Sequence, residues 1–410
     1  MMKKNFISMQ ILLLLTLVFG CYSNAHSEPT QKKHVVILSM DGFRWDYTLD
    51  AKTPTLDSLR RVGSYSQMMP VFPANTFPSH YSMATGLYPN NHGVTNNSFY
   101  DSLADKVRSV FDAEDCNSEG FWGGEPIWNR VEMQGGISHV HMWPGSEYPI
   151  NNRQATVWQK YDHNMDYFKR ADQVIESMSL PIDKVPNLVM WYMPDPDEVG
   201  HHSGPNSKEC IARVEYIDSV LKYFFAKMRE TPYFDNINFI VTSDHGMTQL
   251  AEERYINLYD ILDNSKVLRH IAGSPFCFDT ESDYIDEAVE ALNNVGHLRA
   301  YRSDAMPTRY HFGDHPTRCT NIVIIPDMGW KLDYHKKDGK LPSGGSHGYD
   351  PFESDMQVVF FGAGPNFKHG YSQPTFQNQN IYLIICHLLG IEPAQETDCD
   401  FDSIKSMFIE

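Results

Sequence analysis

Short apolar runs alternate with longer amphipathic segments along most of this chain. The apolar runs 34–42, 186–195 and 237–246 are nearly continuous, as is typical of strands that are buried on both faces. Segments 53–63 and 210–230 carry apolar residues at helical spacing. Strands separated by helices in this way predict an α/β fold, with a doubly wound, mostly parallel sheet and helices on both faces.

A long segment near the middle of the chain has a different pattern. Residues 250–345 indicate a strand, a helix and further strands, and the apolar run 356–365 then returns the chain to the main sheet. We therefore expect a small α+β cap inserted into a core domain over residues 34–395. We expect this cap to cover one edge of a ligand-binding cleft in the core domain and to bring His347, which follows the cap in the sequence, into that cleft.

The first twenty residues form a separate region. Two lysines precede the apolar run 11–20, which is too short to cross a bilayer comfortably and has the pattern of an export signal peptide. Gly20-Cys21 resembles a bacterial lipoprotein cleavage site, at which the cysteine becomes the lipid-bearing N-terminus. The alternative is an ordinary secretory signal that is cut before Pro29. Both alternatives predict export to the periplasm or cell envelope, with a lipid anchor at Cys21 in the first.

The charge of the chain argues against two classes of partner. It has 34 Lys+Arg against 52 Asp+Glu, a formal net charge of −18. A basic face for polymeric nucleic acid or for an anionic membrane surface is therefore not readily formed. We expect a small-molecule substrate, and contact with a membrane only through the lipid anchor.

The cysteines after Cys21 suggest neither a zinc ribbon nor a dithiol redox site. They are dispersed without any C-x-x-C pair. Export permits disulfides, but spacing does not give their connectivity. Cys386 lies inside an apolar run and is expected to be a buried free thiol.

Three carboxylates occupy equivalent positions at the ends of predicted strands. Asp41 follows the first strand, Asp197 the second and Asp244 the third. One such acid alone would be interpreted as a helix cap or a turn residue. Ligands of doubly wound sheets bind beyond the carboxyl ends of the strands, so three acids there, two of them accompanied by histidine, predict a binding site.

Three histidines indicate what these acids bind. His201 lies four residues after Asp197, which puts both side chains on one side of a helical turn. His245 follows Asp244 directly, and His347 lies in a glycine-flanked loop farther along the chain. Carboxylate oxygens and imidazole nitrogens together suit zinc, with manganese or other divalent cations as weaker competitors. A single histidine is more often a core or surface residue, so the joint pattern carries this prediction.

A threonine with a proline close on either side stands out in the loop 71–86. Thr76 precedes a predicted helix, so one interpretation is a helix N-cap. The other is a nucleophile, because a hydroxyl bound to a divalent cation near a helix N-terminus can lose its proton. The two prolines would then fix the geometry of attack.

Six motifs occur in a fixed order along the chain: SMDGFRWDY, FPANTFPSHYSMATGLYPNNHGV, NNSFYD, PDPDEVGHHSGP, SDHGM and GGSHGYD. In this order they resemble the motifs of the nucleotide pyrophosphatase/phosphodiesterase family, within the alkaline phosphatase superfamily. The resemblance spans about residues 34–395 and implies an alkaline-phosphatase-like core with two zinc ions. It assigns Asp41, Thr76, Asp244 and His245 to one ion, and Asp197, His201 and His347 to the other.

The same resemblance gives three more residues a role. Asn97 falls where the family places an amide that hydrogen-bonds a nonbridging phosphate oxygen, although it can also be a turn residue within a formal glycosylation sequon. Phe77 and Tyr161 fall where nucleotide-handling members stack a base between two rings, a position at which aromatics also serve as packing. The stretch 193–197 departs from many relatives, which have two glutamates before the proline-aspartate pair.

The predicted function is that of an exported, metal-dependent phosphodiesterase or nucleotide pyrophosphatase. It would hydrolyse phosphodiester or phosphoanhydride bonds of nucleotides and related diesters through a phosphothreonine at Thr76. One alternative is a phosphomonoesterase or phosphonate hydrolase of the same superfamily, for which no matching arginine or lysine motif stands out. Another is a metal-binding surface lipoprotein without turnover, for which a threonine at this position is not required.

Overall fold

The computed structural model describes residues 32–337 and 339–409. Lys33–Glu410 form one compact unit. The predicted export signal 1–20 and Cys21 lie outside the described residues. Across the described ranges, no helix has both the length and the apolar character that a membrane span requires.

A large mixed sheet forms the centre of this unit. Its strands are β1 (His34–Met40), β2 (Ser64–Met68), β5 (Ser138–His141), β6 (Val157–Gln159), β7 (Leu188–Met193), β8 (Ile237–Thr242), β17 (Val358–Ala363) and β18 (Tyr371–Ser372). They lie in the order β18-β2-β17-β8-β1-β7-β5-β6. Only β17 pairs antiparallel to its neighbours, and the other pairs are parallel. The predicted mostly parallel sheet is confirmed.

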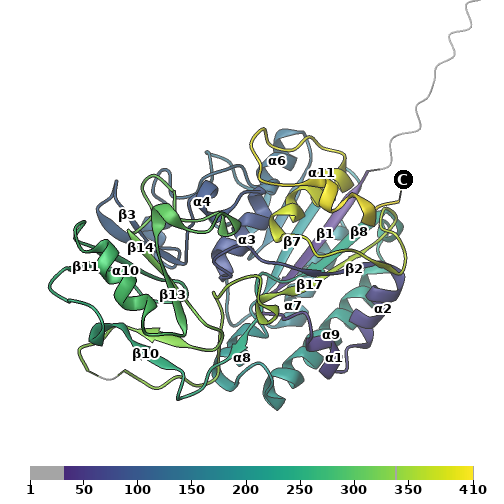
Figure 1. Ribbon diagram of the computed structural model, residues 1–410. Helices are drawn as coiled ribbons and strands as arrows, with labels where there is room; N and C mark the ends of the chain where they lie inside the picture. The colour runs from purple at the N-terminus through teal and green to yellow at the C-terminus, as the bar shows by residue number, and fades with distance from the viewer. Residues whose placement is uncertain (1–31, 338, 410) are drawn as a thin grey trace, which may run out of the picture. The chain divides into compact units, whose positions relative to one another are not determined.

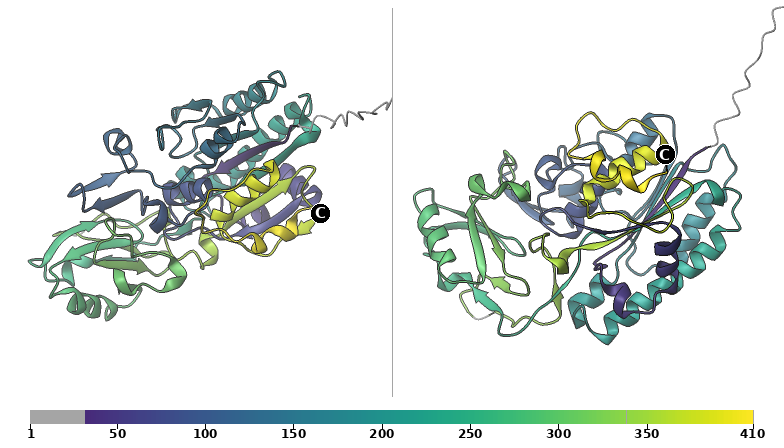
Figure 2. Two further views of the ribbon diagram at one scale, coloured as in Figure 1. Left: turned by 90° about the horizontal axis from the view of Figure 1, so that it is seen from above. Right: turned by 45° about the vertical axis from the view of Figure 1, so that its right-hand side comes forward.

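Helices cover both faces of the sheet (Figures 1 and 2). One face carries α3 (Thr76–Thr85), α6 (Ile127–Met133) and α11 (Ile381–Leu389), and the other carries α2 (Pro54–Val62), α7 (Tyr167–Met178) and α9 (Lys208–Met228). Alternate side chains of β1 point to opposite faces, so Val35 packs with the first group of helices and Val36 with the second. Burial on both faces explains why the strand sequences are continuously apolar.

The insert seen in the sequence forms a smaller α+β unit, drawn in green in Figure 1. Four antiparallel strands lie in the order β11-β12-β14-β13, and a second pair joins β10 to β15. Their apolar side chains share a cluster with α10 that is separate from the core of the main sheet. The bounds are β10 (Tyr255–Asn257), β11 (Val267–Ile271), β12 (Phe276–Thr280), α10 (Ile285–Asn293), β13 (Leu298–Arg302), β14 (Ile322–Pro326) and β15 (Lys331–Asp333). The domain limits 34–395 and 250–345 stay predictions.

The remaining short elements connect these parts. The helices are α1 (Tyr47–Asp50), α4 (Pro89–His92), α5 (Ala113–Cys116) and α8 (Asp197–Ser203), and the strands are β3 (Ser98–Asp101), β4 (Lys106–Ser109), β9 (Thr248–Gln249) and β16 (Gly345–Ser346). Strands β3 and β4 form a hairpin. Strand β16 pairs with β9, so the end of the insert returns to the segment that follows β8.

A buried arginine ties the insert to the main domain. Arg318 donates through Nη1 to the carbonyls of Gly93 and Phe121, both at 2.8 Å. Its Nε donates to Asp101 at 3.2 Å. The guanidinium thus supplies donors to backbone carbonyls that would otherwise be buried without partners.

The described cysteines are all free thiols: Cys116, Cys210, Cys277, Cys319, Cys386 and Cys399. Cys386 is buried in α11 within the apolar cluster of the first face, as its position in an apolar run predicted. An unpaired thiol in such a place behaves as a small apolar group.

Candidate active site

The three predicted strand-end acids meet at one edge of the central sheet. Asp41 follows β1, Asp197 begins α8 after β7, and Asp244 follows β8. Strand β1 lies between β7 and β8, and the backbone N–H of Asp197 donates to the carbonyl of Asp41 at 3.0 Å. The parallel strand order therefore brings together acids that are far apart in the sequence.

The loop after β1 approaches α8 so closely that only glycine fits at one position. Gly42 has φ 67°, and a Cβ built there would lie 2.9 Å from the Cα of Asp197. Its N–H donates to Oδ1 of Asp244 at 3.1 Å. A larger residue at position 42 would push Asp41 away from Asp197 and Asp244.

Asp41, Asp244 and His245 form the first group of candidate metal ligands. One ligand atom of each lies within 4.8 Å of the others. The Nε2 atom of His245 is 3.2 Å from Oδ1 of Asp41 and 3.2 Å from Oδ2 of Asp244. The Oγ1 atom of Thr76 lies 3.2 Å from the same nitrogen. The predicted nucleophile therefore adjoins a buried set of two carboxylates and an imidazole.

Asp197, His201 and His347 form the second group. Oδ1 of Asp197 is 3.4 Å from Nε2 of His201 and 3.6 Å from Nε2 of His347. Asp197 and His201 both lie in α8, one turn apart, as their spacing predicted. The His347 ring stacks on the His245 ring with centroids 3.6 Å apart, so the two groups adjoin.

Backbone carbonyls orient all three imidazoles in the same way. The Nδ1 atom of His201 is 2.9 Å from the carbonyl oxygen of Gly345, and that of His245 is 2.9 Å from the carbonyl oxygen of Gly246. For His347 the corresponding distance, to Ala74, is 3.1 Å. If each Nδ1 carries a proton, the free lone pair is on Nε2, and Nε2 is the atom that faces the carboxylates. Histidines that bind a metal through Nε2 need this arrangement.

The carboxylates of the site are electrostatically incomplete without a cation. Oδ1 of Asp41, Oδ1 of Asp197 and Oδ2 of Asp244 are buried and accept no hydrogen bond from any described residue. Burial, together with the other acids, raises the pKa of Asp41 to about 7, and burial raises the pKa of Asp197 to about 7. Divalent cations between these oxygens and the imidazoles would neutralise the charge and occupy the unused lone pairs. The donor set therefore fits the predicted metals.

Thr76 stands at the start of a helix, but it does not cap it. It is the first residue of α3, and Asn75 occupies the N-cap position, so the capping interpretation of Thr76 does not hold. The Nδ2 group of Asn75 donates to Oδ1 of Asn96 and to the carbonyl of Ser274, both at 2.8 Å. These contacts fix the backbone just before the hydroxyl, which stays directed at His245.

Asn97 lies beside this helix start. Its Oδ1 accepts a hydrogen bond from the N–H of Phe77 at 3.2 Å. The amide oxygen is therefore occupied, and the Nδ2 group is the end that is free to donate. A donor amide next to a hydroxyl is suited to an anionic oxygen.

The two predicted stacking rings occupy partly open positions. Phe77 is half-buried, and the exposed ring of Phe111 meets it edge-on with centroids 5.6 Å apart. Tyr161 is 39% exposed, and its ring centroid lies 6.0 Å from that of Tyr192. Both rings retain exposed surface near the candidate ligands, so a planar group could contact either of them.

Two further residues touch the ligands, and neither was identified from the sequence. His80 is buried on α3, with Nδ1 3.3 Å from Oδ2 of Asp244 and Nε2 2.8 Å from Oγ of Ser39. Tyr192 donates its hydroxyl to Oδ2 of Asp41 at 2.5 Å. His80 follows Thr76 by four residues, so helical spacing could have suggested it. Tyr192 sits inside an apolar strand, where nothing marks it as different from a core aromatic.

Known proteins are similar to this chain in sequence and in fold. The family model for type I phosphodiesterase / nucleotide pyrophosphatase matches residues 35–350. Ectonucleotide pyrophosphatase/phosphodiesterase family member 5 of Homo sapiens is 33% identical over 368 residues, which cover 89% of this chain and 76% of that protein. The bis(5'-adenosyl)-triphosphatase of Mus musculus is 32% identical over 390 residues, covering 93% of this chain and 83% of that protein.

One solved structure adds a ligand to this comparison. It is murine ectonucleotide pyrophosphatase/phosphodiesterase 5 as an inactive threonine-to-alanine variant in complex with AMP. It matches with a TM-score of 0.85 at 29% identity and covers 92% of this chain and 100% of its own. The α/β architecture described above is therefore shared over nearly the whole of both chains.

Proposed function

Because this chain belongs to the type I phosphodiesterase/nucleotide pyrophosphatase family of the alkaline phosphatase superfamily, we propose that it hydrolyses phosphodiester or phosphoanhydride bonds of nucleotides. The AMP complex of the murine relative and the name of the mouse triphosphatase favour nucleotide substrates here too. Export through residues 1–20, with or without a lipid on Cys21, belongs to the same proposal and agrees with the ectoenzyme names of the relatives.

One observation carries this proposal: Oγ1 of Thr76 lies 3.2 Å from Nε2 of His245. These atoms adjoin a cluster of acids whose buried oxygens accept no hydrogen bond from the described residues. A cluster that only stabilised the fold would pair its acids fully. A hydroxyl group at its edge is also not needed for metal binding alone. The unpaired acids are expected of a cation site, and the hydroxyl beside them is expected of a nucleophile.

We assign seven residues to two divalent cations, with zinc as the preferred metal. When bound, the cations supply positive charge that lowers the pKa of oxygens near them. The first ion would be held by Asp41, Thr76, Asp244 and His245, and the second by Asp197, His201 and His347. The Nδ1 contacts of the three histidines keep their Nε2 lone pairs available for this role.

In the proposed reaction, Thr76 Oγ1 attacks the phosphorus of the substrate. A bond from phosphorus to Oγ1 forms, the bond to the leaving-group oxygen breaks, and a phosphothreonine results. The proton of the Thr76 hydroxyl is carried by solvent to the leaving group. A water molecule then attacks phosphorus, the bond from phosphorus to Oγ1 breaks, and a proton of that water returns to Oγ1. The phosphate monoester is released, and two inversions give net retention. The Nδ2 group of Asn97 would hold a nonbridging oxygen, and Phe77 and Tyr161 would stack on the base.

Replacement of the nucleophile tests this proposal. Thr76→Ala should lower turnover of a bis-aryl phosphate by more than about 1,000-fold, whereas Thr76→Ser, which keeps a hydroxyl, should retain measurable turnover. Metal content by elemental analysis should stay close to two ions per chain in both variants, since six other ligands remain. Turnover by Thr76→Ala at a rate near that of wild type would exclude the nucleophile assignment.

A mono-aryl phosphate is the second substrate in the same assay. Faster metal-dependent hydrolysis of the monoester would favour the phosphomonoesterase alternative. Hydrolysis of neither ester, with metal bound, would favour the non-catalytic lipoprotein.

A further inference from the structure

The two candidate ligand groups differ in their exposure to solvent. The acids and the imidazole of the first group are almost closed to it, with side-chain exposed fractions of at most 3%. In the second group the exposed fraction is 18% for Asp197 and 39% for His201. Water and small chelators therefore reach the second group more easily than the first.

The elements that carry the two groups differ as well. Asp41 and Asp244 follow β1 and β8, which are neighbouring strands inside the large sheet. Asp197 and His201 lie in α8, a seven-residue helix that the structure describes in full, with only Gly200 buried. The third ligand of that group follows β16, a strand of two residues. Elements with few buried contacts open locally at a low free-energy cost, so the second group is the less rigid of the two.

Hydrogen bonds to the carboxylates show the same difference. Oδ2 of Asp41 accepts from the hydroxyl of Tyr192 at 2.5 Å, and Oδ1 of Asp244 accepts from the N–H of Gly42 at 3.1 Å. Each contact leaves the other oxygen of that acid for a cation. No described residue donates a hydrogen bond to the carboxylate of Asp197. The acids of the first group are therefore oriented before a metal arrives, and the acid of the second group is not.

The ring of Tyr192 is itself held in place. It meets the ring of His80 edge-on with centroids 5.3 Å apart, and the ring of Tyr161 lies 6.0 Å from it. Tyr192 belongs to β7, which pairs with β1. The strand and the two rings thus fix the hydroxyl that donates to Asp41.

We propose that the two groups hold their cations with unequal affinity. The first group, with two carboxylates in a closed site, keeps its ion, because attraction between opposite charges is stronger where water is excluded. Tyr192 is a positioning residue that strengthens this binding through Asp41. The second group, with one carboxylate in an open site, exchanges its ion with solvent, so turnover follows the free zinc concentration. This inference rests on the proposed function, because it takes over the assignment of the ligands to two cations.

Zinc titration of chelator-stripped protein tests the proposal without turnover. A chromophoric chelator of known affinity reports free zinc, and two binding steps should appear, with dissociation constants about 100-fold apart. X-ray absorption at the zinc edge assigns the steps, since the first group has one imidazole and the second has two. Protein with one equivalent of zinc should show one imidazole per ion. Equal affinity of the two ions, or two imidazoles per ion at one equivalent, would overturn the proposal.

Two substitutions separate the steps. His201→Ala should remove the weaker step and leave the tighter one. In that background a single step remains, and Tyr192→Phe should weaken it about 10- to 100-fold. Tyr223→Phe is the matched control, because Tyr223 also donates its hydroxyl to an acid, Asp172, at 2.6 Å between α9 and α7. A tight step that Tyr192→Phe leaves unchanged, or that both tyrosine variants weaken equally, would exclude the positioning role.

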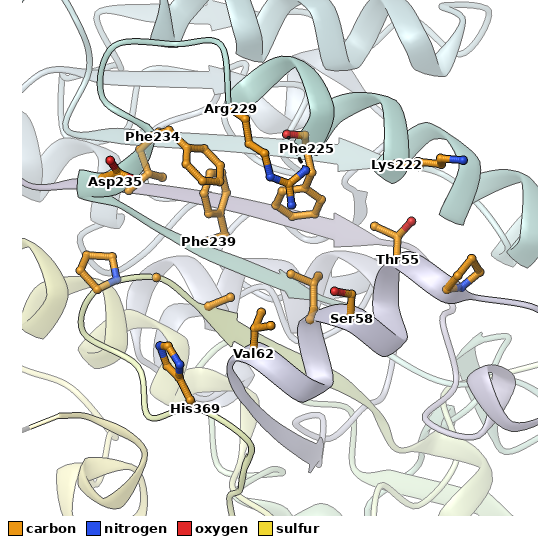
Figure 3. Close-up of a pocket in the computed structure, with 16 residues that line it drawn as sticks. Thr55, Ser58, Val62, Lys222, Phe225, Arg229, Phe234, Asp235, Phe239 and His369 are labelled. Atoms are coloured by element: carbon orange, nitrogen blue, oxygen red, sulfur yellow. Dashed lines mark hydrogen bonds between the residues drawn. The ribbon is translucent and has the colours of Figure 1, made fainter.

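A histidine outside the site controls for adventitious zinc binding. His369 is exposed and lines a cavity of about 630 Å³ between α2, α9, β8 and β17, together with Asp235 (Figure 3). Ile237, at the start of β8, lines the same cavity, whereas Asp244 follows the other end of that strand. His369→Ala should therefore leave both steps within about twofold. Loss of the weaker step in this variant would assign that step to the surface and contradict the proposal.

Turnover of a bis-aryl phosphate over the same zinc range distinguishes this inference from the proposed function. The one-ion form should be about 100-fold slower than the two-ion form, and the rate should rise with the weaker step. If two steps appear but neither form hydrolyses the ester, the proposed function fails, and with it the zinc dependence of turnover, while the unequal binding stands. If the ester is hydrolysed but both ions bind equally, this inference alone is overturned.

Discussion

Removal of one acid, Asp41, should make the metal-free protein less sensitive to alkaline pH. Burial and the charges of Asp244 and Asp197 raise the pKa of Asp41 to about 7, from an ordinary value of 3.8. A carboxyl group with a raised pKa binds its proton more tightly in the folded state. Stability is therefore highest below about pH 4, falls as the pH rises from there, and has lost this contribution entirely above about pH 7. At about 1.4 kcal/mol per pKa unit, the loss is about 4 kcal/mol.

His245 changes stability in the same direction. Although burial opposes it, Asp244, Asp41 and Asp197 raise the pKa of His245 to about 10, from 6.5. Its stabilising charge is present below pH 6.5 and is lost as the pH rises through about 10. Asp41 and His245 therefore both contribute a loss of stability as the pH rises. Asp244 contributes in the opposite direction, because, although burial opposes it, His245 and His80 hold the pKa of Asp244 well below its ordinary value. The contribution of Asp41 is therefore measured by comparing wild type with a variant of Asp41.

Thermal unfolding of chelator-treated protein measures this effect. The folded unit Lys33–Glu410 has about 380 residues, and its unfolding entropy of about 2.1 cal/mol/K per residue converts 4 kcal/mol into a shift of about 5 °C. Between pH 4 and pH 8, the Tm of wild type should fall about 5 °C more than that of Asp41→Asn. Asp50→Asn, at an exposed position on α1, is the control and should follow wild type.

The refuting result is a Tm that falls equally in wild type and Asp41→Asn. Zinc supplies a second criterion, because the cation takes the place of protons at the same oxygens. Restored zinc should raise the Tm of wild type more at pH 8 than at pH 5, and should raise that of Asp41→Asn less. A zinc effect that is independent of pH would contradict the electrostatic account of the site.

Two further substitutions test the tie between insert and core and the proposed base site. Arg318→Met removes the hydrogen bonds that the carbonyls of Gly93 and Phe121 accept, whereas Asp101 keeps its contact with Arg108 at 3.1 Å. Two buried carbonyls without a partner should cost about 2–6 kcal/mol and lower the Tm by several degrees in calorimetry; an unchanged Tm would show that the tie is dispensable. Phe77→Ala should raise KM for nucleotide esters about tenfold but change bis(p-nitrophenyl) phosphate little, with Phe111→Ala as the neighbouring control. Equal effects of Phe77→Ala on both substrates would exclude base stacking.

The acids of the site were predictable because their positions follow from strand topology. A parallel sheet places the carboxyl ends of neighbouring strands together, and β1, β7 and β8 are neighbours. Asp41, Asp197 and Asp244 were therefore expected at the same edge of the sheet once these runs were identified as parallel strands, and the order β8-β1-β7 brings them into contact. His201 followed from helical spacing, and α8 has that spacing. Local periodicity was sufficient for these four residues.

Other features depend on contacts that periodicity does not encode. His347 directly follows β16, whose pairing with β9 returns the chain to the site. The motif resemblance assigned His347 to a metal ion, but the apolar pattern did not indicate the residue. The antiparallel direction of β17 is set by the path of the insert, since the chain must return from that unit to the sheet. Tyr192 contacts Asp41 from inside an apolar strand, where its neighbours predict only core packing. These contacts are long-range, so they become visible only in the folded chain.

The origin of each part of the site has a consequence for how substrate preference can change. The candidate nucleophile and the first ligand group come from the main domain, whose strands and helix α3 fix them. The insert, in contrast, has its own apolar cluster, but it also reaches the nucleophile, because the carbonyl of Ser274 accepts a hydrogen bond from Asn75 Nδ2 at 2.8 Å. Substitutions in the insert that keep this contact can therefore change the surroundings of the second ligand group without moving Thr76. A substitution that displaces Ser274 should shift the start of α3 as well.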